Sequence, residues 1–137
     1  MAQSTRGPLI GYAAAALGGV LGALARWGVS RALPSPPGGW PWATLLVNLT
    51  GCALIGVLLP VLLARFPAHP WLRPFLVTGV LSGYTTFSAL TVDAVRLVDA
   101  GAPVTAAAYV LASVLGGLLA VVAGLSTGRA LLRGPAR

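Results

Sequence analysis

Four long apolar stretches decide what this chain can fold into. They cover residues 9–29, 42–64, 75–97 and 104–125. Each has about 20 residues or slightly more, which is enough for a helix to cross a hydrocarbon core of ~30 Å. Only 8% of the residues are charged, whereas a soluble globular domain has about 25%. The sequence therefore predicts an all-α membrane protein with four spanning helices.

The breaks between these stretches are short, so the 137 residues are predicted to form a single transmembrane domain. Between the first two stretches, residues 33–39 contain three prolines and two glycines, which cannot continue a helix. The first stretch is too long for the apolar core of a signal peptide, and it carries Arg26. We therefore expect it to be a helix of the mature protein.

The chain has few residues that could catalyse a reaction or bind a metal ion through side chains. Cys52 is the only cysteine and His69 the only histidine, which excludes a disulfide framework and a His/Cys metal site. No nucleophile and base pair is apparent, so the chain is predicted not to be an enzyme. The net charge of +7 comes from nine arginines at the ends of the apolar stretches, which is typical of membrane flanks and not of nucleic-acid binding.

The arginines also predict an orientation. With four spans, both termini lie on one side of the membrane. That side collects Arg6, Arg65, Arg73, Arg129, Arg133 and Arg137. The other side has Arg31, with Arg26 and Arg96 close to it on the helices. Because cytoplasmic loops are rich in Lys and Arg, both termini are predicted to be cytoplasmic.

Glycines within the spans predict close helix contacts, and two polar residues there allow more than one interpretation. Gly18 with Gly22, and Gly79 with Gly83, have the spacing that lets two helix backbones approach closely. Arg26 is either an arginine that extends to the membrane interface or a functional charge. Asn48 lies deeper, and its amide could make a structural bond between helices or contact a ligand.

The remaining polar residues of the spans favour an anion over a cation. They are neutral donors with no carboxylate among the mid-span residues, namely Thr85, Thr86, Ser88, Tyr109 and Ser113. Tyr109 and Ser113 are four residues apart and so share a helix face. Phe87 is ordinarily a packing residue, but the electropositive edge of its ring can contact an anion.

Three ordered segments carry a resemblance to a known family. They are GALARW at residues 22–27, WATLLVNLTG at 42–51 and GYTTFS at 83–88. Together with the length and the four spans, they resemble the Fluc (CrcB) family of fluoride ion channels. The resemblance implies a passive, fluoride-selective channel in a prokaryotic cell membrane, which gives fluoride resistance by letting toxic fluoride leave the cytoplasm.

The resemblance further implies an antiparallel dimer with two pores and a third helix broken near its middle. Pore residues by similarity are Asn48, Phe87, Ser113, Tyr109, Thr86 and Ser88, with Arg26 at the vestibule or dimer interface. The carbonyls of Ser82 and Thr85 would hold a structural Na⁺ at the centre of the interface, since buried unwound backbone suits a hard cation.

One departure from the family pattern bears on the partner. Leu90 stands where a second phenylalanine is usual, and an aliphatic side chain offers no polarised ring edge. An antiparallel homodimer needs dual topology, but the arginine bias is large here. We therefore expect a homologous chain of opposite orientation as the partner, with a second copy of this chain as the alternative.

Two other functions remain open from the sequence. A small multidrug-resistance transporter has a similar size, but proton coupling needs a membrane carboxylate, for which Asp93 is the only candidate. A non-conducting structural membrane subunit is the second alternative.

Overall fold

The structure, a computed structural model, describes residues 6–133, and all the regular secondary structure in this range is helical. The elements are α1 (Arg6–Ala32), α2 (Trp42–Arg65), the π-helix η1 (Pro74–Leu81), α3 (Ser82–Tyr84), α4 (Phe87–Asp99) and α5 (Pro103–Arg133). Four segments are long and apolar enough to cross a membrane, and η1, α3 and α4 together form the third. The predicted all-α architecture with four spans is confirmed.

The fourth helix continues beyond the apolar stretch from which it was predicted. It was expected to end near residue 125, where Ser126, Thr127 and Gly128 interrupt the apolar pattern, but α5 continues to Arg133. The Ser126 and Thr127 hydroxyls donate to the carbonyls of Val122 and Ala123 at 3.0 Å each. Their polarity is satisfied inside the helix, so they do not end it.

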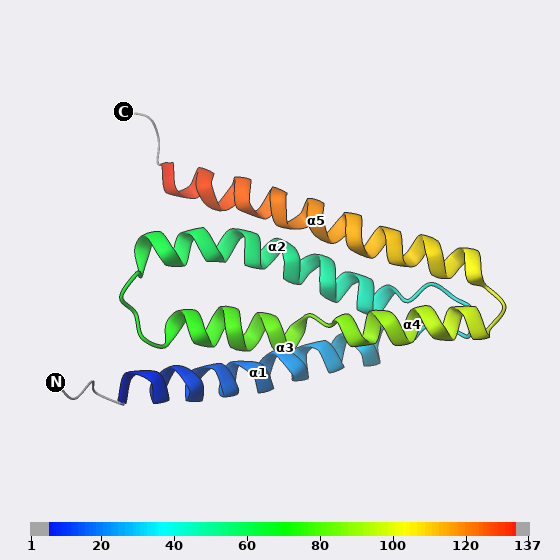
Figure 1. The fold of residues 1–137 in the computed structure, drawn as a ribbon, viewed down its shortest axis with the longest axis horizontal. Helices are drawn as coiled ribbons and strands as arrows, with labels where there is room; N and C mark the ends of the chain where they lie inside the picture. The colour runs from blue at the N-terminus through cyan, green and yellow to red at the C-terminus, as the bar shows by residue number, and fades with distance from the viewer. Residues whose placement is uncertain (1–5, 134–137) are drawn as a thin grey trace.

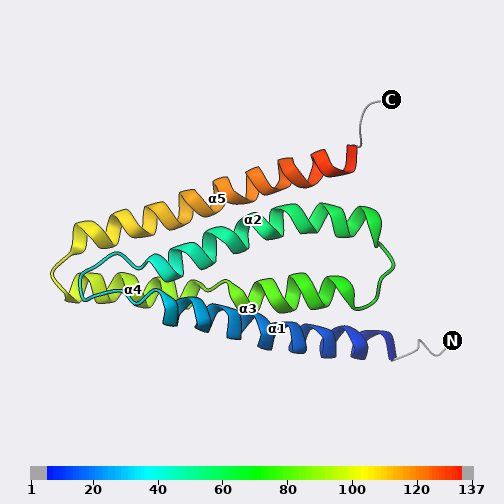
Figure 2. The same ribbon diagram turned by 180° about the vertical axis from the view of Figure 1, so that it is seen from behind.

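The helices run back and forth as a bundle in which α5 lies beside α2, and α1 lies beside η1 and α3 (Figures 1 and 2). The start of α1, the end of α5 and the connection from α2 to η1 lie at one end of the bundle. The opposite end carries the connections from α1 to α2 and from α4 to α5. In the latter, Gly101 adopts φ +76°, a conformation that favours glycine.

Charge is distributed unevenly between these two ends. The first end contains Arg65, Arg73, Arg129 and Arg133, on α2, α5 and the connection before η1. The opposite end contains Arg31, Arg96 and both aspartates of the sequence. Arg137 and the side chain of Arg6, which also entered the orientation prediction, lie outside the described residues. The remaining arginines are distributed between the two ends of the bundle as the sequence predicted.

Backbone contact at glycines joins α1 to the first half of the third span. A Cβ atom at Gly18 would lie 2.9 Å from the Val80 nitrogen, and one at Gly22 would lie 2.7 Å from the Tyr84 nitrogen. Both distances are shorter than real Cβ contacts, so any side chain here would push the helices apart. The glycine spacing read from the sequence therefore marks a helix interface, and this interface lies within one subunit.

The third span is interrupted at Thr85 and Thr86. Thr85 has φ −73° and ψ 156°, and Thr86 has φ −153° and ψ 125°, so both residues are extended. The sequence predicted unwinding from Ser82 onward, but Ser82–Tyr84 is still helical. Gly83 remains part of this helical turn. Its missing side chain allows α3 to lie close to α1, since a Cβ there would meet the Gly19 backbone.

Candidate functional site

The break is held open by the side chain of Asn48, which reaches across from α2. Its Nδ2 donates to the Thr86 carbonyl at 2.9 Å, and its Oδ1 accepts from the Thr86 N–H at 2.8 Å. The Asn48 Oδ1 thus takes the place of the Ser82 carbonyl as partner of the Thr86 N–H, and Nδ2 adds a bond to the Thr86 carbonyl. Of the two interpretations of Asn48, the structural bond between helices is present. One of the two Nδ2 protons remains free for a further partner.

Thr86 also begins the second half of the span. Its Oγ1 accepts from the Ala89 N–H at 3.1 Å, the usual bond of a helix N-cap, and lies 3.2 Å from Ser88 Oγ. The side chain of Ser88 is exposed and serves this local contact. A threonine at the break therefore lets α4 start again immediately after two extended residues.

These bonds divert the donors that an unbroken helix would give to two carbonyl groups. The Thr86 N–H, which would bond Ser82 O, bonds Asn48, and the Ala89 N–H, which would bond Thr85 O, bonds Thr86 Oγ1. Among the described residues, no hydrogen bond to the Ser82 or Thr85 carbonyl oxygen takes their place. The carbonyl groups of Ser82 and Thr85 are therefore among the strong acceptors that the break leaves without donors.

A groove of about 720 Å³ opens beside the break, and we call it the break groove. It lies between α2, the two sides of the break and α5. The predicted site residues that line it are Asn48, Ser82, Thr85, Thr86, Phe87, Leu90 and Ser113. The tertiary structure therefore brings together side chains from three separate spans. Tyr109, Ser88 and Arg26 are not among its lining residues.

The two ring positions of the family pattern lie in different surroundings. The Phe87 side chain is 78% exposed, so this subunit alone provides almost no packing for its ring. Leu90, three residues later, is 8% exposed and packs against Tyr109 in the main apolar cluster. A protein or lipid neighbour is therefore needed to cover Phe87, whereas Leu90 is already part of the core.

Ser113 and Tyr109 are buried on α5 without hydrogen-bond partners. Tyr109 is 0% exposed and Ser113 is 6% exposed, and both hydroxyls lack a partner among the described residues. A serine in a membrane helix commonly bonds its own backbone, but Ser113 does not. Leaving a buried hydroxyl unpaired costs about 1–3 kcal/mol. Two such groups one turn apart are donors available to a bound ion or water.

The sequence analysis missed the group next to this pair. Thr44 Oγ1 donates to Asp93 Oδ2 at 2.6 Å, and Arg96 lies 3.8 Å from the other carboxylate oxygen. Asp93, Thr44 and Ser113 all lie near the Tyr109 hydroxyl, but none of them makes a hydrogen bond with it. Thr44 lies four residues before Asn48, and this spacing on one face of α2 is the signal that could have found it.

Arg26 lies apart from these groups. It is half-buried on α1, one turn beyond the Gly22 contact with α3. Its guanidinium makes no hydrogen bond or ion pair with the other described side chains. Its placement at a vestibule or interface stays a prediction.

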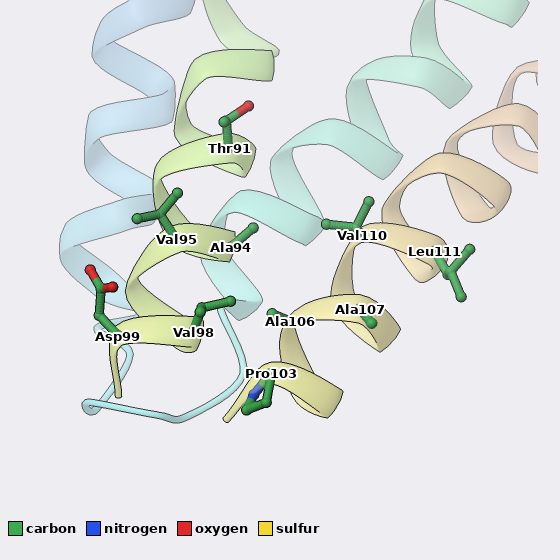
Figure 3. Close-up of a pocket in the computed structure, with 10 residues that line it drawn as sticks. All are labelled: Thr91, Ala94, Val95, Val98, Asp99, Pro103, Ala106, Ala107, Val110 and Leu111. Carbon is green, nitrogen blue, oxygen red and sulfur yellow. The ribbon is translucent and has the colours of Figure 1, made fainter. Parts of the chain in front are cut away.

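A second groove, between α4 and α5, differs sharply from the break groove (Figure 3). It is about as large, at 720 Å³, but valines, alanines, a leucine and a proline form most of its wall. Of its two polar residues, Asp99 points its carboxylate away from α5 in Figure 3. An ion would find few partners there, so the break groove is the candidate site.

The sequence is similar to a known family over most of its length. Residues 13–125 match the model of the family described as CrcB-like protein, Camphor Resistance (CrcB). The chain is 50% identical over 120 residues to fluoride-specific ion channel FluC 2 of Thermobifida fusca (strain YX), covering 88% of this chain and 89% of that protein. Identity to fluoride-specific ion channel FluC of Rhizobium meliloti (strain 1021) is 46%, covering 84% of this chain and 93% of that protein.

A third relative is longer. Fluoride-specific ion channel FluC 2 of Streptomyces avermitilis is 50% identical over 101 residues, which span 74% of this chain but only 64% of the relative. The match of the family model begins within the first span and ends within the fourth, and it includes the second and third spans, the break and the residues of the break groove. The chain therefore belongs to the CrcB family.

Proposed function

We propose that this chain is a subunit of a fluoride-specific channel that lets fluoride leave the cytoplasm by passive flow. The names of its relatives, which match most of the chain, support a channel rather than an enzyme. The structural observation that carries the proposal is the break groove. There an amide, a buried hydroxyl and an aromatic ring meet at interrupted backbone inside a membrane span, with no carboxylate in the lining.

Neutral donors suit fluoride because it is small and holds its water tightly. An ion that enters a dry path must exchange its water for protein donors, and a larger halide gains less from the same contacts. The free Nδ2 proton of Asn48 and the Ser113 hydroxyl are such donors. The exposed Phe87 can add its electropositive ring edge. Tyr109 continues the row beyond Ser113.

The break also fits a structural sodium ion. The carbonyl oxygens of Ser82 and Thr85 are among those without donors at the break, and carbonyl oxygen is a ligand that hard cations accept. No cluster of three or more His, Cys, Asp or Glu side chains lies within residues 6–133, so backbone oxygens are the ligands to expect. When bound, the ion supplies a fixed positive charge near the anion path. Thermal stability of the purified protein should then rise with sodium concentration, and equal stability in sodium and N-methylglucamine would contradict the site.

The exposed Phe87 and the charge distribution support a second subunit of opposite orientation. Arginines gather at the end that carries both termini, so the chain is expected to insert in one orientation, with that end in the cytoplasm of a prokaryotic cell. We infer that the partner is a homologous chain with the reverse bias. Some relatives are numbered FluC 1 or FluC 2, which is consistent with paired genes.

A liposome efflux assay with a fluoride electrode tests the function. We expect rapid fluoride release and negligible chloride release when this chain is reconstituted with its homologous partner. The chain alone should release little fluoride. Release by the purified chain alone would contradict the heterodimer but not the channel. Equal release of chloride and fluoride, or no release from either preparation, would contradict the channel.

A further inference from the structure

Trp40 carries a buried donor that the fold does not use. It lies between α1 and α2, two residues before α2 begins. Its indole Nε1 is fully buried and has no hydrogen-bond partner among residues 6–133. The indole nitrogen can only donate, so no acceptor role explains it. Burying it unpaired carries a desolvation cost that an apolar ring at the same place would avoid.

The unpaired indole lies beside the row of unpaired hydroxyls on α5. The rings of Trp40 and Tyr109 are perpendicular, with centroids 5.9 Å apart. Tyr109 in turn lies one turn from Ser113, which lines the break groove. Three buried groups without partners, from two distant parts of the sequence, therefore follow one another from the break groove toward the α1–α2 connection.

A second cavity lies at the far end of this row. Residues 35–39 of the α1–α2 connection and the end of α4 enclose about 400 Å³, which we call the loop pocket. Asp93 and Arg96 are part of its lining. Trp40 directly follows the lining residue Gly39, and Asp93 also flanks the Tyr109 hydroxyl. The row of unpaired groups thus lies between two cavities at different depths in the bundle.

We propose that the Trp40 indole N–H is a further donor on the fluoride path, between Tyr109 and the loop pocket. This inference rests on the proposed channel function and extends the path beyond the residues taken from the family pattern. An anion that leaves the Tyr109 hydroxyl needs another donor before it regains water. The Asp93 carboxylate at this point is bonded by Thr44 and faces Arg96, so Trp40 offers the uncommitted donor.

A purely structural alternative has a different signature. The perpendicular rings would allow the indole N–H to point at the face of Tyr109, which is a weak N–H···π contact. Loss of that contact would lower stability and leave fluoride flow unchanged. The two roles are therefore separated by measuring flow and stability on the same variants.

The test compares Trp40→Phe with Trp42→Phe in the liposome assay, with the partner chain present. Trp42 is a matched control because it is a neighbouring tryptophan with a 62% exposed side chain. We expect Trp40→Phe to lower fluoride turnover about tenfold, as for one lost hydrogen bond to an ion, with little change in melting temperature. Trp42→Phe should stay within about twofold of the wild type in turnover.

A second substitution changes a single group. Replacing Trp40 by its benzothienyl analogue exchanges the N–H for sulfur and keeps the shape of the double ring, so packing is preserved even if Trp40→Phe folds poorly. The analogue should show the same loss of turnover. Wild-type turnover in the analogue would overturn the proposal and leave the channel function intact. Absence of fluoride flow in the unmodified pair would instead contradict the channel function itself.

Discussion

The two halves of this bundle differ at the level of the break, although glycines bring helix backbones together in both: a Cβ at Gly124 on α5 would lie 3.0 Å from the Gly56 Cα on α2. Where α1 meets η1 and α3, glycines let the backbones touch, and within residues 6–133 no buried side-chain donor or acceptor is left unpaired there. Where α2, α4 and α5 meet around the break, the contacts depend on amide and hydroxyl side chains. Of these, Ser113 and Tyr109 have no partner. The first interface can supply stability, since close packing joins helices in lipid. The second keeps donors free at some cost in stability.

The largest effect is expected at the glycine interface. Gly18→Leu should prevent the bundle from assembling, because a Cβ at Gly18 would already press on the Val80 backbone. Loss of at least about 3 kcal/mol is expected from such overpacking. Size-exclusion chromatography and thermal unfolding would show it. Gly19→Leu is the matched control, since a Cβ there meets nothing within 4 Å. Equal damage from both substitutions would argue against the interface.

The next largest effect is expected where the polar half is fixed. Asn48→Leu removes both bonds to Thr86 and should lower fluoride efflux about 100-fold, as for two lost hydrogen bonds at the break. Thr127→Val on α5 is the control, because that exposed hydroxyl donates to its own helix at Ala123 O, 3.0 Å away, and lies outside the break groove. Unchanged fluoride efflux in Asn48→Leu would show that the Asn48 amide is not part of the fluoride path.

Ser113→Ala separates the two halves most directly, because function and stability should move in opposite directions. Removing an unpaired buried hydroxyl should leave the melting temperature unchanged or slightly higher, while fluoride efflux falls about tenfold. Ser126→Ala serves as control, since that hydroxyl bonds the Val122 carbonyl and lies outside the break groove. Lower stability with normal efflux would identify Ser113 as a structural residue.

The smallest effect is expected at Leu90, which belongs both to the core and to the groove wall. Leu90→Phe should cost about 1 kcal/mol of unfolding free energy, because the larger ring meets a side chain cluster that is already packed. Leu90→Met, which conserves volume, is the control. Unchanged stability together with faster efflux would show that the added ring points into the groove.

Much of the fold could be predicted because the bilayer imposes simple rules. Span number and approximate limits follow from apolar length, and the glycine interfaces follow from four-residue spacing. The end of α5 was missed because Ser126 and Thr127 look like a polar break, although local bonds satisfy them inside the helix. The start of the break was missed because Ser82 was expected on unwound backbone, whereas Ser82–Tyr84 stays helical and Gly83 within it contacts Gly19.

The sequence by itself determined that this chain crosses a membrane four times, and its motifs determined the family. It could not decide between a structural and a ligand-binding Asn48, since either role needs the same amide. Only the tertiary structure showed that α2 brings this amide to the Thr86 backbone, and that Tyr109, Ser113 and Trp40 are buried without partners. Hydrogen bonds between distant segments depend on which faces the packed helices present, and no local pattern records them.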